Sequence, residues 1–297
     1  MSTPLSPTAR EIQEQIESNT SAVDHFSSFA VHRQHMTALA LRDVAPEAGL
    51  RLCILGAGNC YDVDLVKLAS SYREIHLVDV DPAALARARQ PLGADAGAKV
   101  FSHAPLDLSG LFDRLDRWAR LEVEPQELLG HAAEASAQIA RSLPGPFDVV
   151  ISACLLSQIQ LAIYNVLSAA HPLFDAVRHV ANLTHLRTLA ALMAPAGRAF
   201  FATDVASNDL FPLAEVREQS DLRPLLATLV RSGSVVFAVS PDLLTWTARE
   251  DPVVQRAVEV SEPVDAWLWQ NGPDRLFLVY ALELRARAKE ARLPTLT

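Results

Sequence analysis

Short apolar runs and longer amphipathic stretches alternate along the chain. The apolar runs are rich in Leu, Val and Ile and are mostly continuous, which is typical of strands buried on both faces of a parallel sheet. This pattern predicts five strands, at Leu52–Leu55, Ile75–Val80, Lys99–Ser102, Phe147–Ser152 and Arg198–Thr203.

The stretches around these runs carry apolar residues at helical spacing. One helix is expected to open at Asp81-Pro82, because Asp caps a helix and Pro suits its first position. The other expected helices are Ala9–Ser18, Asp24–Val44, Val63–Ser70, Leu111–Arg120, Pro125–Arg141 and Leu155–Met193. Strands that alternate with helices predict a doubly wound parallel sheet, since each crossover is right-handed and covers one face.

The carboxyl-terminal part of the chain has a different pattern. Trp267–Gln270 and Arg275–Glu283 flank Asn271-Gly-Pro-Asp274, a turn sequence typical of a hairpin. We therefore expect the α/β class, with a mostly parallel seven-stranded sheet, a terminal antiparallel hairpin and an N-terminal helical cap. Residues 1–48 are expected to form a leader and this cap, and residues 49–297 the doubly wound domain.

Composition and charge limit the classes of partner. The chain has 297 residues, half of them hydrophobic, and a formal net charge of −9, which argues against nucleic acid as a partner. No apolar run reaches the ~18 residues of a membrane span, so no membrane contact is expected. The cysteines Cys53, Cys60 and Cys154 lack metal-ligand spacing, which favours a reducing, cytoplasmic location and predicts no metal site. Nothing in the sequence indicates the oligomeric state.

A glycine turn follows the first expected strand. Gly56 and Gly58 would let the backbone approach a ligand closely, and Asp79 ends the next strand about 20 residues further on. An acidic side chain at that place can accept hydrogen bonds from a ribose diol. These features predict a nucleoside-bearing cofactor at the carboxyl ends of the strands.

The residues after the turn bear on the kind of cofactor. A dinucleotide site requires a third small residue, and this chain has Tyr61 there. Asp62 and Asp64 precede the next helix, where carboxylates repel a pyrophosphate and suit an amino group. The pattern therefore favours a cofactor with a ribose and no phosphate, and leaves an NAD(P)-dependent oxidoreductase as an alternative.

Five segments carry a family resemblance. They are Leu55–Asn59 (LGAGN), His76–Leu85 (HLVDVDPAAL), Ala104–Gly110 (APLDLSG), Phe147–Ile159 (FDVVISACLLSQI) and Leu192–Asp204 (LMAPAGRAFFATD). In this order and spacing the chain resembles the class I, Rossmann-like S-adenosylmethionine-dependent methyltransferases. The resemblance covers Arg51 to Leu284 and implies S-adenosyl-L-methionine as cofactor.

The resemblance also assigns residues to parts of the cofactor. Gly56, Ala57 and Gly58 would pass under its methionine part, with Gly58 approaching it most closely. Asp79 would hold the ribose hydroxyls, and Val80 would lie near the adenine. The remaining assigned positions are Asp107 and Leu108 at the adenine amino group, and Ser152, Ala153 and Cys154 at the methyl-transfer site.

The chain departs from the family pattern at two positions. Ile54 stands where an acidic residue often reaches the cofactor's amino group, and Cys60 stands where a third glycine is common. We expect Asn59 and Asp62 to supply the polar contacts to the methionine end instead.

Methyl transfer from a sulfonium is a direct displacement, so no catalytic residue has to be evident in the sequence. Ser152-Ala-Cys-Leu stands where enzymes that methylate the amino groups of nucleic-acid bases have an Asn/Asp-Pro-Pro-aromatic motif, which favours a small-molecule acceptor. An aminopropyltransferase and a non-catalytic cofactor-binding relative remain alternatives. Further candidates on the substrate side are Asp204 and the histidines His25, His32, His35, His171, His179 and His185.

Overall fold

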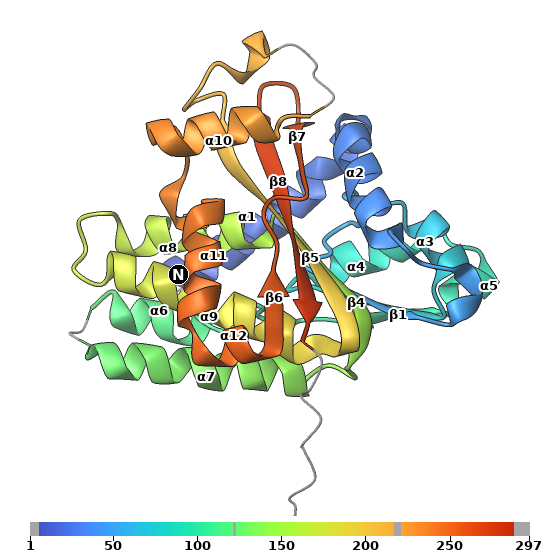
Figure 1. Ribbon diagram of the computed structural model, residues 1–297, viewed down its shortest axis with the longest axis horizontal. Helices are drawn as coiled ribbons and strands as arrows, with labels where there is room; N and C mark the ends of the chain where they lie inside the picture. Colours follow the sequence, from blue (N-terminus) through green and yellow to red (C-terminus); the bar gives the residue numbers. More distant parts are fainter. Residues whose placement is uncertain (1–5, 121–122, 217–220, 288–297) are drawn as a thin grey trace, which may run out of the picture.

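The computed structural model describes residues 6–120, 123–216 and 221–287. One sheet of eight strands organises these residues, in the order β3-β2-β1-β4-β5-β8-β6, with β7 also paired to β8 (Figure 1). The strands are β1 (Arg51–Leu55), β2 (Glu74–Val78), β3 (Val100–His103), β4 (Phe147–Ala153), β5 (Met193–Ser207), β6 (Val258–Val260), β7 (Asp265–Gln270) and β8 (Leu276–Ala286).

The helices follow the strands in the alternation that the sequence predicts. Among the described residues the α-helices are α1 (Pro7–Ser21), α2 (Ala30–Leu41), α3 (Leu65–Ser71), α4 (Pro82–Arg89), α5 (Ala94–Gly97), α6 (Phe112–Trp118), α7 (Pro125–Arg141), α8 (Leu155–Leu167), α9 (Phe174–Leu192), α10 (Arg223–Ser232), α11 (Pro241–Glu250) and α12 (Pro252–Ala257). Short 3₁₀ segments are η1 (Ala22–Phe29), η2 (Pro46–Ala48), η3 (Leu213–Glu215) and η4 (Phe237–Val239).

Helices cover both faces of the sheet, as a doubly wound fold requires. On one face, α7, α9, α10, α11 and α12 enclose an apolar core with the sheet, and on the other face α2, α3 and α4 do so. A third apolar cluster joins α6, α7, α8 and α9 outside the first layer. The predicted α/β class with a doubly wound sheet is therefore confirmed.

The parallel and antiparallel parts of the sheet meet at β5. Strands β3, β2, β1, β4 and β5 run parallel, and β8 pairs with β5 in the antiparallel sense. The predicted hairpin is confirmed, because β7 and β8 pair from Asp265↔Ala281 to Gln270↔Leu276 and Gly272 has φ +77° in the turn. The short β6 is one strand more than predicted; it pairs with the far end of β8.

Two helix predictions are corrected by the structure. The stretch Leu155–Met193 is two helices, because Ser168 takes φ +62° and ends α8, and α9 starts at Phe174. The stretch Asp24–Val44 begins as the 3₁₀ segment η1, in which His25 departs from helical angles, and only α2 continues it. Periodicity alone does not reveal these breaks, since the apolar spacing continues through both.

Candidate functional site

The glycine turn after β1 adopts the left-handed backbone that its sequence suggests. Gly56 has φ +66°, Gly58 φ +48° and Cys60 φ +57°. The turn is fixed by two backbone hydrogen bonds, from Ala57 N to the Val78 oxygen (3.0 Å) and from Cys60 N to the Ala57 oxygen (2.7 Å). Since L-residues with a side chain rarely take positive φ, this angle explains why a glycine would suit position 60.

Asp79 lies directly beside this turn. Its Oδ2 accepts a hydrogen bond from Gly58 N at 2.8 Å, and its Oδ1 accepts one from Asp81 N at 2.9 Å. Asp79 is buried, and burial raises the pKa of its carboxyl while these backbone hydrogen bonds oppose the rise. The structure thus brings together the two features that the sequence connected, with the half-buried Val80 next to them.

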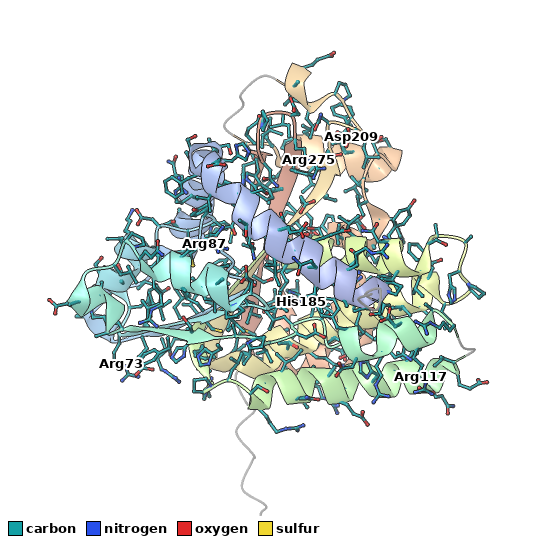
Figure 2. All side chains as sticks on the ribbon, turned by 180° about the vertical axis from the view of Figure 1, so that it is seen from behind. Arg73, Arg87, Arg117, His185, Asp209 and Arg275 are labelled. Carbon is teal, nitrogen blue, oxygen red and sulfur yellow. The ribbon has the colours of Figure 1, made fainter. Side chains whose placement is uncertain are left out.

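Helix α1 crosses the carboxyl edge of the sheet and reaches the same turn. It packs against α4, α6 and α8, and Figure 2 shows it running diagonally across the middle of the molecule. Near its end, Asn19 donates from Nδ2 to Asp81 Oδ2 (3.2 Å), and its backbone oxygen accepts a hydrogen bond from Asn59 Nδ2. Arg87 Nε in turn donates to Asn59 Oδ1 (2.9 Å), so the side chain of Asn59 is held by α1 and α4.

Both glycines of the turn are in close contact with other parts of the chain. A Cβ at Gly58 would lie 3.1 Å from Asn19 Oδ1, and a Cβ at Gly56 would lie 3.1 Å from the side chain of Leu155. The absence of a side chain at Gly56 and Gly58 therefore leaves the room that a closely approaching ligand would need. In this structure the side chains of Leu155 and Asn19 fill that room. Neither Asn19 nor Leu155 carries a sequence signal for this contact, because only the path of α1 and α8 brings them here.

Asp62 lies in a charged and aromatic group next to the turn. Its Oδ1 is 3.2 Å from Nε2 of His32, whose Nδ1 accepts a hydrogen bond from Trp267 Nε1 at 3.0 Å. The side chain of His32 is completely buried, and its ring stacks on Trp269 with centroids 4.6 Å apart. His32 is therefore an internal contact of Asp62, while the Asp62 side chain keeps 22% of its surface exposed.

Asp107 and Leu108 have structural contacts of their own. The Asp107 carboxylate accepts hydrogen bonds from Ser109 N (2.8 Å), from Ser109 Oγ and from Phe112 N (3.1 Å). Burial raises the pKa of this carboxyl, and Leu108 belongs to the apolar core. Asp107 thus fixes the loop that leads into α6, and its contact with an adenine stays a prediction.

The last residues of β4, Ser152 and Ala153, are buried in the core. Ser152 Oγ lies 3.0 Å from Nε2 of His185 on α9, where both side chains are buried, so this hydroxyl is engaged in the core. Burial lowers the pKa of His185 to about 4, and the imidazole is neutral at pH 7. Ala153 is also buried, between Ser152 and Cys154.

Cys154 and the end of β5 form a second polar group. Cys154 takes φ +51°, and Ser157 Oγ lies within hydrogen-bond distance of both the Cys154 oxygen (3.0 Å) and Asp204 Oδ1, to which its one proton can be donated in turn. Burial raises the pKa of the Asp204 carboxyl and of the Cys154 thiol. A buried thiol with a raised pKa is a packing group and not a nucleophile.

Two further kinds of feature are absent from the described residues. In residues 6–120, 123–216 and 221–287, no three His, Cys, Asp or Glu side chains come together as a metal ion would require. None of the helices in that part of the chain combines the length and the apolar character needed to cross a membrane. A cavity of about 560 Å³ opens at the opposite edge of the sheet, beside Asp148, Arg198 and Arg285.

Comparisons with known proteins give a structural likeness only. No family model and no curated protein matches the chain. A chain of the complex between the Haloferax volcanii Trm112 methyltransferase activator and a putative methyltransferase matches at 14% identity and a TM-score of 0.42, over 89% of this chain and 96% of that one. An rRNA methylase from Streptococcus thermophilus matches at 11% identity and a TM-score of 0.37, over 86% and 96%. A structure that is described by the conversion of a disulfide bond into a thioacetal group during echinomycin biosynthesis matches at 15% identity and a TM-score of 0.40. The match covers 85% of this chain and 82% of that one.

The chain is thus similar to solved structures that are described as methyltransferases. At these identities the likeness concerns the fold, and the substrates of those proteins are not transferred to this chain.

Proposed function

We propose that this protein binds S-adenosyl-L-methionine at the carboxyl edge of β1 and β2 and transfers its methyl group to a small-molecule acceptor. The observation that carries the proposal is the hydrogen bond between Gly58 N and Asp79 Oδ2. It joins the glycine turn to the acidic end of β2, where an open α/β sheet binds its ligands. The antiparallel β8 beside β5 supports the same family, because the resemblance implies that arrangement.

The residues at this edge suit a cofactor that combines a ribose with an amino group. Gly56, Ala57 and Gly58 would pass under its methionine part, and Asp79, followed by Val80, would accept hydrogen bonds from the ribose diol. Asn59 and the partly exposed Asp62 would contact the methionine end. When bound, S-adenosyl-L-methionine supplies the electrophilic methyl carbon.

The helix that follows the turn is unfavourable for a dinucleotide. Asp64 caps α3, and its side chain accepts a hydrogen bond from Lys67 N at 3.0 Å. A carboxylate at this helix start uses the amide and opposes the charge that would attract a pyrophosphate. This contact favours the phosphate-free cofactor over NAD(P).

The protein's own part in the reaction is positioning and exclusion of water. Phe26 and Phe29 each pack edge to face on Tyr61, which directly follows Cys60 of the turn, with ring centroids 5.0 Å and 5.8 Å from that of Tyr61. Such a wall keeps water from a reactive sulfonium and holds an acceptor in line. Cys154 and Ser152 border the expected methyl-transfer site through backbone and packing, since their side chains are engaged elsewhere.

Calorimetry on the full chain tests the proposal. S-adenosylhomocysteine should bind to the wild type, NAD should not, and Asp79→Ala should weaken binding at least tenfold because the ribose loses its acceptor. Asp95→Ala, an exposed carboxylate on α5, is the matched control and should leave binding unchanged. Binding of NAD alone would contradict the proposal. Binding of the cofactor without turnover on a panel of acceptors would instead support a non-catalytic relative.

A further inference from the structure

Helix α1 is held on the sheet edge mainly by polar contacts. Thr8 N donates to Asp116 Oδ1 (3.0 Å) and Asn165 Nδ2 donates to Glu11 Oε2 (3.0 Å). Of its 15 residues only Thr8 is buried, and its two isoleucines, Ile12 and Ile16, are half-buried. Because only one of its residues is fully buried, α1 detaches at a lower free-energy cost than a core helix such as α9, in which twelve residues are buried.

The last turn of α1 lies where a ligand would approach the glycine turn. Asn19 Oδ1 lies 3.1 Å from the place that a Cβ at Gly58 would take, and Asn19 Nδ2 donates to Asp81, whose backbone N in turn donates to Asp79 Oδ1. The backbone oxygen of Asn19 also accepts a hydrogen bond from the side-chain amide of Asn59. Asn19 thereby contacts two residues of the proposed site, Gly58 and Asn59, and also Asp81, the cap of α4.

The segment η1, which connects α1 to α2, can act as a hinge. Within η1, His25 has φ −117° and ψ +16°, outside the helical range. The next helix is fixed, because Met36 and Leu39 of α2 are buried in the core and Tyr72 Oη donates to the Ala40 oxygen. A rotation at η1 would therefore move α1 and leave α2 in place.

We infer that α1 is a displaceable strap, and that its residue Asn19 competes with the methionine part of the proposed cofactor for the space above Gly58. This inference rests on the proposed function for the identity of the ligand and on the contacts of Asn19 for the competition. Binding requires α1 to leave the edge, so the apparent affinity is the intrinsic affinity reduced by the fraction of molecules in which α1 is detached. Weakening the hold of Asn19 should then strengthen binding.

Hydrogen exchange of the 297-residue chain tests the strap without any ligand. The amides of α1 should exchange much faster than those of the buried helix α9, and Asn19→Ala should speed their exchange several-fold while α9 stays unchanged. Ser18→Ala is the matched control, since Ser18 is the exposed neighbour of Asn19. If α1 exchanges as slowly as α9, or if Asn19→Ala has no more effect than Ser18→Ala, the strap is refuted.

Calorimetry with S-adenosylhomocysteine then tests the competition. Asn19→Ala should lower Kd about threefold or more relative to both the wild type and Ser18→Ala. A higher or unchanged Kd would overturn the inference, because Asn19 would then be a wall of the site or irrelevant to it. If neither the wild type nor Asn19→Ala binds, the proposed function fails, and the exchange experiment alone decides about the strap.

Discussion

The imidazole of His32 joins Trp267 on β7 to Asp62 beside the glycine turn. Its Nδ1 accepts from the indole at 3.0 Å, so in the neutral ring the proton is on Nε2, which lies 3.2 Å from Asp62 Oδ1. This arrangement connects the hairpin, the N-terminal cap and the proposed site in one chain of contacts. His32 is therefore a residue that positions Asp62, and its completely buried ring, with Nδ1 occupied by the Trp267 indole, is not placed to take a proton from an acceptor.

Replacing His32 should destabilise the fold. His32→Phe keeps an aromatic ring against Trp269 but leaves the buried Trp267 Nε1 without an acceptor, which costs about 1–3 kcal/mol. Urea unfolding measures the loss. The control is His35→Phe, because His35 is half-exposed and its pair with Asp265 is worth less than about 1 kcal/mol. An equal loss in both variants would argue against the role given to the Trp267 contact.

The backbone at position 60 predicts an unusual order of stabilities. Because Cys60 holds φ +57°, Cys60→Gly should be more stable than Cys60→Ala by about 1 kcal/mol, the cost of left-handed backbone for a residue with a side chain. In the middle of a helix or strand the order would be reversed. Thermal unfolding of the two variants at one pH decides between these orders, and a more stable Cys60→Ala would contradict the strain.

The sequence predicted the layers of the fold because they follow from local patterns. Apolar runs, caps and turn residues identified β1, β2, β4 and the β7–β8 hairpin, and the glycine spacing located the turn beside Asp79. The contact of Asn19 with Gly58 could not be predicted in this way, since the helix expected from the sequence ends at Ser18, whereas α1 continues to Ser21 and carries Asn19. Such a contact depends on where α1 lies against the sheet, which no periodicity encodes.

The same limit applies to individual side chains. Ser152 and Asp107 stand at the sequence positions that the resemblance assigns to the cofactor, yet their side-chain oxygens bind His185 and the loop before α6. Motif spacing fixes the backbone position of a residue. The direction of its side chain follows from the local pairing of polar groups, which becomes visible only in three dimensions.

The pH dependence of stability should reveal His185. Its pKa is lowered by burial to about 4 in the folded protein, against about 6.5 in the unfolded chain. The folded protein favours the neutral form of His185. The stability that this preference contributes is fully present above pH 6.5 and is lost as the pH falls from 6.5 toward 4. Between pH 7 and pH 5 the unfolding free energy should drop by about 2 kcal/mol from this residue alone.

Denaturant unfolding at the two pH values measures this drop. In His185→Gln the drop should be smaller by about that amount, because glutamine does not titrate and can still accept from Ser152 Oγ. His25→Gln changes an exposed histidine and should leave the dependence as in the wild type. The assignment is wrong if the two variants behave alike.

Asp62 should determine affinity at the methionine end of the cofactor. Since Ile54 offers no carboxylate there, the partly exposed Asp62 is the acidic side chain we expect to meet the ammonium group, and Asp62→Ala should weaken binding of S-adenosylhomocysteine about tenfold. A charge-assisted hydrogen bond of this kind is worth about 1.5–3 kcal/mol. Asp62→Asn should recover part of the loss, because an amide oxygen can still accept a hydrogen bond. His32→Phe should weaken binding less than Asp62→Ala, as it disturbs only the orientation of the carboxylate. Calorimetry on the three variants measures this order, with Asp95→Ala as the control for charge, and an Asp62→Ala protein that binds like the wild type would refute the role of Asp62.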